Sequence, residues 1–481
     1  MTAQNETFFW HDYETSGTDP QRDRPMQFAG IRTDADLNII EDPVMIYARP
    51  ADDMLPHPMA CLITGITPQI ALDRGVSEAE FIAKIHAELA RPGTCGVGYN
   101  SIRFDDEVTR NTLYRNFYDP YAREWQNGCS RWDIIDMLRL TRALRPDGIV
   151  WPTYEDGTPS LRLEDLTKAN GIEHGSAHDA LSDVYATIAM AKLVKEKQPK
   201  LFEYVIHNRS KLAIQKLIDP QSMKPVLHVS SRYPVEQGNM AVVAPIAVHP
   251  TNKNATIVWD LRQDPAPLFE LSAEQIKQTL YLPRDQRDEN TPKLALKLLH
   301  ANRCPIVAPA NMLRGDEPTK FAIDGDQCRA NLALLRNEPN LRDKLMAVYH
   351  EDRDAIADPD LQIYSGGFFS NDDKKLIDRV READVESLYE LQLPFQDPRL
   401  EEMLLRYKAR NFPETLTDEE LLSWEEFRAQ KLLKGTGGYL TFEALYSELN
   451  RIAELPETTA DQRAILEDIA LYAESIYPFE P

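Results

Sequence analysis

Residues 7–17 read T-F-F-W-H-D-Y-E-T-S-G, an apolar run that ends in two carboxylates one residue apart. Side chains alternate along a β-strand, so Asp12 and Glu14 would lie side by side on one face, with Tyr13 on the other. Two like charges beside aromatic rings repel each other and lose hydration. Either the strand runs out into solvent here, or a divalent cation binds both carboxylates. The stretch therefore predicts a strand with a candidate metal site at its end.

The bulk composition is that of an ordinary globular protein. The chain has 481 residues, of which 42% are hydrophobic and 27% charged, and this length is enough for two to four domains. No apolar run reaches the roughly eighteen residues of a membrane helix, and the first residues lack the features of a signal peptide. The five cysteines are far apart and have no metal-ligand spacing. We expect a cytoplasmic protein with reduced thiols and no membrane partner.

The net charge of −23 is unevenly distributed along the chain. Residues 351–481 hold 14 Lys and Arg against 30 Asp and Glu, whereas residues 201–350 hold 19 against 16. A strongly acidic protein is an unusual partner for nucleic acid. This distribution is nevertheless compatible with a local basic groove, although it excludes a uniformly basic surface.

The first 200 residues alternate between strand-like and helical patterns. Residues 7–49 contain three strand-like runs separated by short turn signals such as S-G-T-D-P. Ser77 begins a helix with a capping box completed by Glu80. C-G-V-G-Y reads as a buried strand, after which Asn100 or Ser101 caps a helix that runs to about residue 117. Further helices are predicted over 133–144, 160–169 and 178–197. This order is typical of an α/β domain that ends near Pro199.

The pattern changes after residue 200. A helical linker is followed by short β-like pieces separated by Pro and Asn, as in a small, partly open β-barrel with helical inserts. From about Asp354 onward the chain is nearly all amphipathic helix. We therefore predict three domains, with the boundaries 1–198, 199–353 and 354–481.

Further acids follow the opening pair, and each has an ordinary structural interpretation. Asp105, with the two acids after it, falls in the first turn of a predicted helix, where the helix dipole favours carboxylates. Asp183 lies among apolar residues of a later helix, where an unpaired carboxylate is costly. His178 lies five residues earlier, and its ordinary interpretation is a histidine on the surface. None of these residues is decisive alone.

Taken in order, these residues resemble the DEDD exonucleases of the proofreading type, in the subclass whose fifth residue is histidine. Asp12 to Gly17 meets the form D-x-E-T-[ST]-G, Asn100 to Asp105 meets N-x-x-x-F-D, and His178 to Asp183 meets H-D-A-x-x-D. Longer stretches are similar to the bacterial exonuclease I (exodeoxyribonuclease I) family. They include G-Y-N-S-I-R-F-D-D-E-V-T-R-N and, near the C-terminus, Y-K-A-R-N-F-P-E-T-L. The likeness covers essentially the whole chain.

This resemblance implies an α/β ribonuclease-H-like exonuclease domain, followed by an SH3-like β-barrel domain and an all-α C-terminal domain. It also implies a monomeric 3′–5′ exonuclease of DNA repair and recombination that degrades single-stranded DNA and releases 5′-mononucleotides. Its further partner would be the C-terminal tail of the single-stranded DNA-binding protein. The residues after 200 would hold the DNA strand.

The resemblance assigns catalytic roles as well. Asp12, Glu14 and Asp183 would hold one Mg²⁺, Asp12 would bridge to a second Mg²⁺, and Asp105 would act through water, with Mn²⁺ as a substitute metal. His178 would be the general base. Five helical steps place His178 and Asp183 about 140° apart. His178 must therefore reach the site from the first turn of the helix or from the loop before it.

The segment between residues 110 and 145 is rich in arginine and aromatic residues and contains no lysine. Aromatic faces stack on unpaired bases, and arginine contacts phosphate. About half of these aromatics, among them Trp132 and Tyr114, are expected in the core. The predicted strand-path residues here are Arg110, Tyr121, Trp125 and Arg139. The resemblance adds Leu161 to the predicted DNA-binding residues and assigns Glu14 and Arg162 to substrate binding near the scissile end. Further candidates for DNA contact are Asn254, His300, Asn302, Arg303, Tyr364, Phe368 and Phe369.

Three alternatives remain open from the residues. A 3′–5′ exoribonuclease would use the same five residues, since only the 2′-hydroxyl separates the substrates, although small enzymes of that kind would end near residue 190. A non-catalytic nucleic-acid-binding scaffold could keep the fold. A structural Ca²⁺-type site would leave His178 unexplained.

Overall fold

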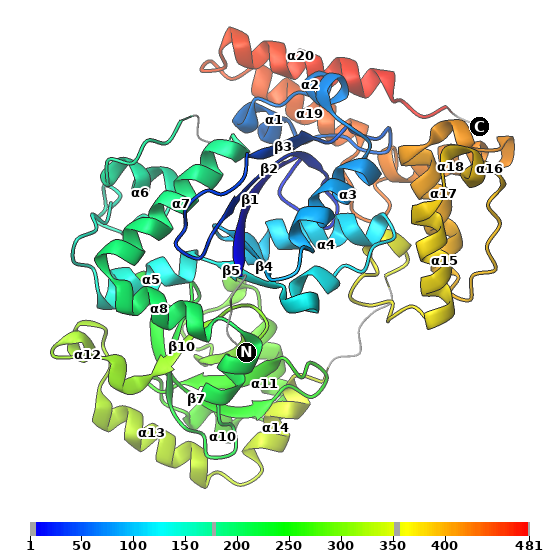
Figure 1. Ribbon diagram of the computed structural model, residues 1–481. Helices are drawn as coiled ribbons and strands as arrows, with labels where there is room; N and C mark the ends of the chain where they lie inside the picture. Colours follow the sequence, from blue (N-terminus) through cyan, green and yellow to red (C-terminus); the bar gives the residue numbers. More distant parts are fainter. Residues whose placement is uncertain (1–5, 176–178, 351–355, 480–481) are drawn as a thin grey trace. The chain divides into compact units, whose positions relative to one another are not determined.

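The computed structural model describes residues 6–175, 179–350 and 356–479 (Figure 1). The chain divides into two compact units. The first has the bounds Met1–Arg131, His174–Tyr185 and Arg353–Pro481, and the second has the bounds Trp132–Glu173 and Ala186–Asp352. The N-terminal strands and the C-terminal helices thus belong to one unit.

A five-stranded sheet in the order β3-β2-β1-β4-β5 organises the N-terminal part of the chain. β1 is central, antiparallel to β2 and parallel to β4. The three strands predicted over residues 7–49 are present, although the third begins only at Val44. The strands are β1 (Thr7–Thr15), β2 (Pro25–Thr33), β3 (Val44–Tyr47), β4 (Thr94–Gly98) and β5 (Ser130–Asp133).

The two faces of β1 have different roles. Phe9 and Tyr13 pack with residues of α3 and α4 in one apolar cluster, and Figure 1 shows these two helices lying over the sheet. Because side chains alternate, Asp12 and Glu14 point to the opposite face. The register with β2 shifts between Glu14 and Thr15, and such a bulge redirects side chains at the end of a strand.

The helices of the first unit begin close to the predicted positions, with two local corrections. Ser77 caps α3 by accepting from the Glu80 amide at 3.3 Å, but the Glu80 carboxylate pairs with Lys84 at 2.8 Å rather than closing a capping box. The predicted cap at Asn100 or Ser101 is wrong. Residues Ser101–Arg103 form a 3-10 turn, and the α-helix begins only at Asp105. The helices are α1 (Pro58–Thr64), α2 (Pro68–Arg74), α3 (Glu78–Leu89) and α4 (Asp105–Arg115), with α7 (Ala180–Lys197) beginning in this unit and continuing in the second.

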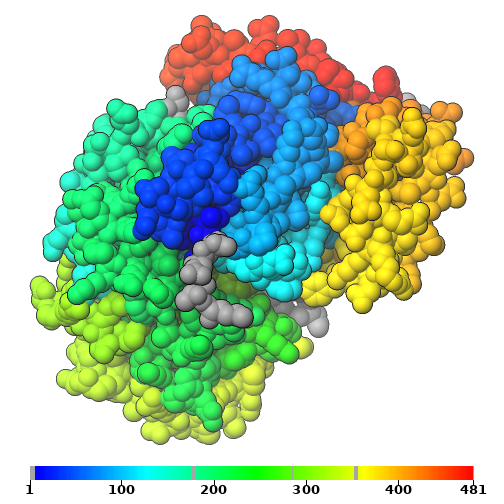
Figure 2. Space-filling view, viewed as in Figure 1, coloured from blue at the N-terminus to red at the C-terminus, as the bar shows by residue number. Residues whose placement is uncertain are grey.

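The C-terminal helices share their core with the N-terminal part of the first unit. Leu55 and Cys61 are buried in one cluster with residues of α19 and α20, and Tyr114 and Phe117 are buried in another with residues of α15 and α17. Figure 2 shows the red α20 beside the blue segment of α1 and α2. The helices are α15 (Asn371–Glu382), α16 (Val385–Glu390), α17 (Arg399–Asn411), α18 (Asp418–Leu432), α19 (Phe442–Ala453) and α20 (Ala460–Ser475).

The second unit is built on an antiparallel sheet in the order β10-β6-β7-β8-β9. β9 was not predicted, because L-K-L-L-H carries little of the alternation typical of a strand. The strands are β6 (Val226–Val229), β7 (Met240–Val248), β8 (Ala255–Asp260), β9 (Leu296–His300) and β10 (Ile306–Pro309). The helices are α5 (Ile135–Leu144), α6 (Leu163–Ala169), α8 (Pro199–Asn208), α9 (Lys211–Leu217), α10 (Ala266–Glu270), α11 (Ala273–Tyr281), α12 (Glu317–Lys320), α13 (Gly325–Asn337) and α14 (Leu341–Val348).

Candidate active site

Three carboxylates from two elements converge at the end of β1. Asp12 and Glu14 lie on this strand, and Asp183 lies in the first turn of α7. One oxygen from each carboxylate lies within 4.8 Å of the others. Glu14 is buried, whereas Asp12 and Asp183 are half-buried. The three carboxylates are therefore close enough together to bind one cation.

A fourth carboxylate, that of Asp105, joins them from the start of α4. Its Oδ1 accepts a hydrogen bond from the Tyr13 backbone amide at 3.1 Å, which fixes Asp105 beside β1. We call Asp12, Glu14, Asp105 and Asp183 the carboxylate cluster. Strand alternation and the helix start, both visible in the sequence, thus bring the predicted acids together.

The carboxylate cluster carries strong mutual repulsion. Burial, followed by the charges of Asp105, Glu14 and Asp183, raises the pKa of Asp12 well above its ordinary value. Burial and then the Asp183 charge raise the pKa of Glu14 to about 8. The neighbouring Asp179 raises both pKa values further. A donor set of carboxylate oxygens only, held too close for all to be ionised, fits a hard divalent cation such as Mg²⁺.

Gly17, the last residue of the motif after β1, is required by close packing. A Cβ atom at this position would lie 2.3 Å from Asp23 Oδ2 and 2.4 Å from His57 Cδ2. A larger residue would require the Asp23 and His57 side chains to move, and Asp23 Oδ2 already accepts a bond from the Asp19 amide at 2.7 Å. The glycine of the motif therefore has a structural role next to the cluster.

The three consecutive acids at the start of α4 have three different roles. Asp105 belongs to the carboxylate cluster, whereas Asp106 is buried and accepts from Arg123 at 2.6 Å and Arg131 at 3.1 Å. Glu107 accepts from Arg110 at 2.8 Å and also bonds the Tyr364 hydroxyl. The sequence placed all three in one helical turn but did not separate these roles.

Among the described residues, His174 contacts the site, whereas the sequence singled out a different histidine, His178. His178 lies outside the described residues, so its predicted role stays a prediction; the first described residue of α7 is Ala180. His174 was missed, and its Nε2 lies 2.6 Å from Asp183 Oδ1. It precedes α7 in a loop, where no periodic pattern relates it to Asp183.

The strand-path candidates of the first unit form an aromatic and charged group. Arg110 is buried, pairs with Glu124 through two bonds of 2.7 and 2.8 Å, and lies 5.4 Å from the Tyr121 ring centroid. Tyr121 contacts the rings of Tyr364 and Phe368. Because carboxylates already occupy Arg110, it is positioned to hold Tyr121 rather than to present a free charge. Trp125 and Phe368 are 66% and 87% exposed and are open to a ligand.

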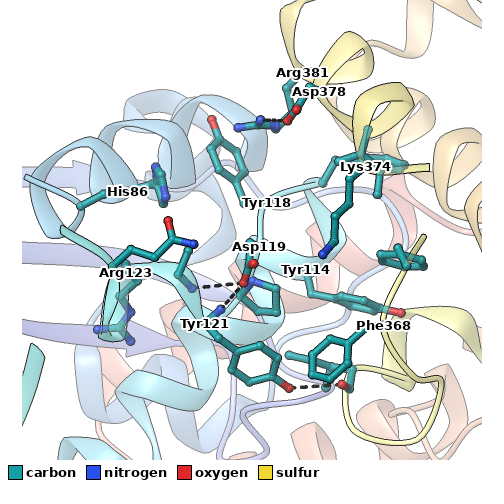
Figure 3. Close-up of a pocket in the computed structure, with 18 of the residues that line it drawn as sticks. His86, Tyr114, Tyr118, Asp119, Tyr121, Arg123, Phe368, Lys374, Asp378 and Arg381 are labelled. Carbon is teal, nitrogen blue, oxygen red and sulfur yellow. Dashed lines mark hydrogen bonds and ion pairs between the residues drawn. The ribbon is translucent and has the colours of Figure 1, made fainter. Parts of the chain in front are cut away.

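A cavity of about 490 Å³ adjoins this aromatic group in the first unit. Figure 3 shows the Lys374 side chain directed into it, with Tyr118 and Phe368 among the residues that line it. Arg381 stacks over Tyr118 at 4.5 Å from the ring centroid. Phe369 stacks nearly parallel to Tyr114, with ring centroids 6.0 Å apart. Tyr114 is buried, as is Trp132 of the second unit, which confirms the prediction that both belong to the core.

The remaining strand-path candidates lie in the second unit. Arg139 pairs with Asp136 at 2.6 Å, and the exposed Arg162 pairs with Glu164. Burial, then the charge of Arg303, lowers the pKa of His300 to about 4. Leu161, Asn254 and Asn302 are half-buried, Arg303 is exposed, and all four lie in or beside loops. Their predicted contacts with DNA stay predictions.

Three family models match successive parts of the chain. They are described as Exonuclease (residues 9–191), Exonuclease I SH3-like domain (209–351) and Exonuclease I C-terminal domain (357–476). The exodeoxyribonuclease I of Escherichia coli K12 is 47% identical over 483 residues, which is 98% of each chain.

The chain belongs to the exonuclease I family.

Solved exonuclease I structures share the fold over almost the whole chain. The enzyme from Methylocaldum szegediense superposes with a TM-score of 0.94 at 49% identity, covering 98% of this chain and 100% of that one. E. coli exonuclease I in complex with a dA16 oligonucleotide gives 0.92 at 46% identity and the same coverage. The predicted fold class, a nuclease domain followed by SH3-like and helical C-terminal parts, is confirmed.

Relatives in the exonuclease I family are known in complexes with a metal ion and with a partner protein. Its exonuclease domain is metal-dependent, and one E. coli exonuclease I–ssDNA complex is a zinc-bound form. Another E. coli structure contains SSB, exonuclease I and an inhibitor. Among the described residues, no helix has the length and apolarity needed to cross a bilayer.

Proposed function

We propose that this chain is a 3′–5′ exodeoxyribonuclease that degrades single-stranded DNA to 5′-mononucleotides in DNA repair and recombination. The observation that carries the proposal is the carboxylate cluster: Asp12, Glu14 and Asp183 from two elements lie within reach of one cation, and Asp105 is fixed beside their strand by the Tyr13 amide. The relatives named exodeoxyribonuclease I and the E. coli complex with dA16 support DNA as the substrate.

The metal of this site is proposed to be Mg²⁺. Asp12, Glu14 and Asp183 would hold one ion, and Asp12 would also contact a second. Bound Mg²⁺ supplies charge stabilisation at the phosphate and lowers the pKa of water. The all-oxygen donor set supports Mg²⁺ over softer metals, with Mn²⁺ as a substitute.

The chain's own residues would orient the reactants and move the proton. Asp105, fixed by the Tyr13 amide at 3.1 Å, would position the attacking water through a hydrogen bond. His178 would remove its proton, since an imidazole titrates near neutral pH. The half-buried carboxylates would limit access of bulk water, which strengthens each charge interaction in the site.

The DNA strand is proposed to stack on exposed aromatic rings. Trp125 and Phe368 present free ring faces, and Tyr121 lies between Phe368 and the buried Arg110. Stacking on aromatic rings tolerates any base, as a nuclease without sequence preference requires. Arg162, which is exposed, is proposed to contact a phosphate near the scissile end.

Partner and location are part of the same proposal. The E. coli structure that contains SSB supports docking of the C-terminal tail of the single-stranded DNA-binding protein on this chain. All five cysteines are buried and none is in a disulfide bond, which fits a reducing compartment such as the cytoplasm. We propose a monomer with the domain boundaries 1–198, 199–353 and 354–481.

The test compares labelled single-stranded DNA, RNA and duplex DNA with Mg²⁺, using Asp12→Ala as the inactive variant. The exposed Asp36→Ala is the matched control, because it removes an acid of the same unit outside the cluster. We expect shortening of single-stranded DNA from the 3′ end by wild type and Asp36→Ala, and under about one per cent of this rate for Asp12→Ala.

The substrate panel also separates the alternative functions. Preferential cleavage of RNA would establish an exoribonuclease instead. Binding of single-stranded DNA with no cleavage in Mg²⁺ or Mn²⁺ would establish a scaffold that keeps the fold. Wild-type activity in Asp12→Ala would show that the carboxylate cluster is not the reaction centre.

A further inference from the structure

His174 contacts the carboxylate cluster from the loop between α6 and α7. Its Nε2 lies 2.6 Å from Asp183 Oδ1, and its side chain is only 9% exposed. An ionised carboxylate can only accept hydrogen bonds, so when Asp183 is ionised, as a metal ligand must be, the imidazole nitrogen is the donor. The short distance is typical of a hydrogen bond to a charged group.

The backbone beside His174 is built for this contact. A Cβ atom at Gly175 would lie 3.1 Å from Ser182 Oγ, the residue just before Asp183. The loop therefore passes close to the first turn of α7, where a glycine fits most easily. This approach brings the imidazole to Asp183 although nine residues separate the two.

The hydrogen bond restricts the one member of the cluster that comes from a helix. An aspartate can turn about two side-chain torsions, and repulsion from Asp12 and Glu14 favours orientations away from them. Asp183 has an oxygen within 4.8 Å of theirs despite this repulsion. A donor bonded to its Oδ1 opposes the rotation and withdraws negative charge from the cluster.

We propose that His174 is a positioning residue, which holds the Asp183 carboxylate in the orientation that binds the metal. The proposal rests on the metal-dependent nuclease function proposed above. Hydrogen-bond partners of metal ligands typically change metal affinity by about 10- to 100-fold when they are removed. His174 would therefore act on metal binding before DNA is present.

The alternative is that the His174 ring only fills space in a buried loop. Two substitutions separate the readings in the full-length chain. His174→Phe keeps a planar ring of similar size but removes the donor, whereas His174→Gln keeps an N–H donor but removes the ring. The exposed His207→Ala is the matched control for the loss of an imidazole.

The measurement is Mn²⁺ binding by isothermal titration calorimetry without DNA, with thermal melting in EDTA as a check on folding. We expect His174→Phe to bind Mn²⁺ about 10-fold more weakly than wild type, with His174→Gln and His207→Ala within about threefold. Wild-type affinity in His174→Phe, or an equal loss in the Phe and Gln variants, would overturn the proposal.

A further variant distinguishes failure of this inference from failure of the proposed function. Asp12→Asn should lack the tight Mn²⁺ binding that the wild-type protein shows. If wild type itself shows no binding that depends on Asp12, the metal-dependent function fails. If that binding is present and His174→Phe leaves it unchanged, only the role of His174 fails.

Discussion

Replacing Asp106 by asparagine removes a charge that two buried guanidinium groups share. Asp106 is 1% exposed and accepts from Arg123 at 2.6 Å and Arg131 at 3.1 Å, and both arginines are themselves buried. Breaking a buried ion pair from one side costs about 3–5 kcal/mol, because the partner charge stays in the interior. Glu124 still lies 3.3 Å from Arg131. We therefore expect a loss of about 3 kcal/mol, at the lower end of that range.

The adjacent Asp105→Asn variant should behave in the opposite way. The asparagine oxygen can still accept the Tyr13 amide bond of 3.1 Å. The substitution also removes one of the charges that raise the pKa values of Asp12 and Glu14. We expect unfolding free energy in EDTA equal to or above that of wild type, and turnover at least about 100-fold lower.

Urea unfolding followed by circular dichroism gives the stability, and release of nucleotides from labelled single-stranded DNA gives the rate. Burial alone would raise the pKa of Asp106, but the charges of Arg123 and Arg131 hold this pKa below its usual range. Its stabilisation is therefore present above about pH 4 and is lost as the pH falls below that value. Wild-type stability in Asp106→Asn, or a normal rate in Asp105→Asn, would refute the division of roles between the two acids.

Four further outcomes are expected. His178→Ala should lower the rate by about 100-fold or more, the scale of a general base, and the acidic limb of the pH–rate profile should change; an unchanged profile would place the base elsewhere. Phe368→Ala should weaken binding of single-stranded DNA by about 1–3 kcal/mol, the value of one stacked base, whereas the exposed Phe479→Ala should not. The pKa of Glu14 is raised to about 8 in the folded state, whereas in the unfolded chain Glu14 has its ordinary pKa of about 4.5. Between these two pH values the folded state keeps a proton on Glu14 that the unfolded chain releases. In EDTA, wild-type stability relative to Glu14→Gln should thus fall between about pH 4.5 and 8, and thermal melting with Mg²⁺ should show a larger gain at pH 8 than at pH 6. Residues 1–198 alone should aggregate in solubility and light-scattering assays, since truncation exposes buried apolar residues.

Local rules predicted part of the carboxylate cluster, and the resemblance to the DEDD exonucleases joined Asp105 and Asp183 to the Asp12–Glu14 pair. Strand alternation placed Asp12 and Glu14 on one face, and the start of α4 placed Asp105 beside a buried strand. The opening strands were predicted for the same reason, since their apolar runs and turns are local signals. His178 lies outside the described residues, so this part of the predicted site stays a prediction.

The contacts that local patterns could not predict are those between distant segments. Nothing near Asp106 in the sequence indicates that Arg123 and Arg131 will neutralise it. The bond from His174 to Asp183 depends on the path of a loop. These contacts arise from packing, and their partners are seen only once the chain has folded.

The C-terminal helices illustrate the same limit on a larger scale. The sequence predicted residues 354–481 as a separate helical domain whose role is to hold DNA. In the structure, Leu55 and Cys61 are buried against α19 and α20, and Tyr114 and Phe117 against α15 and α17.

Ion pairs extend this connection between the N-terminal and C-terminal parts of the first unit. Asp53 is fully buried, and its Oδ2 accepts from Arg410 at 2.9 Å and from Lys431 at 2.8 Å. The Arg22 side chain, in the loop after the motif that ends β1, donates to the Gly437 carbonyl at 2.7 Å. Because this buried carboxylate pairs with cations from two C-terminal helices, separating these helices would leave it with only the longer ion pair to Arg24, at 3.6 Å. The C-terminal helices therefore support the loop that follows Asp12 and Glu14, and any role in holding DNA is added to that structural one.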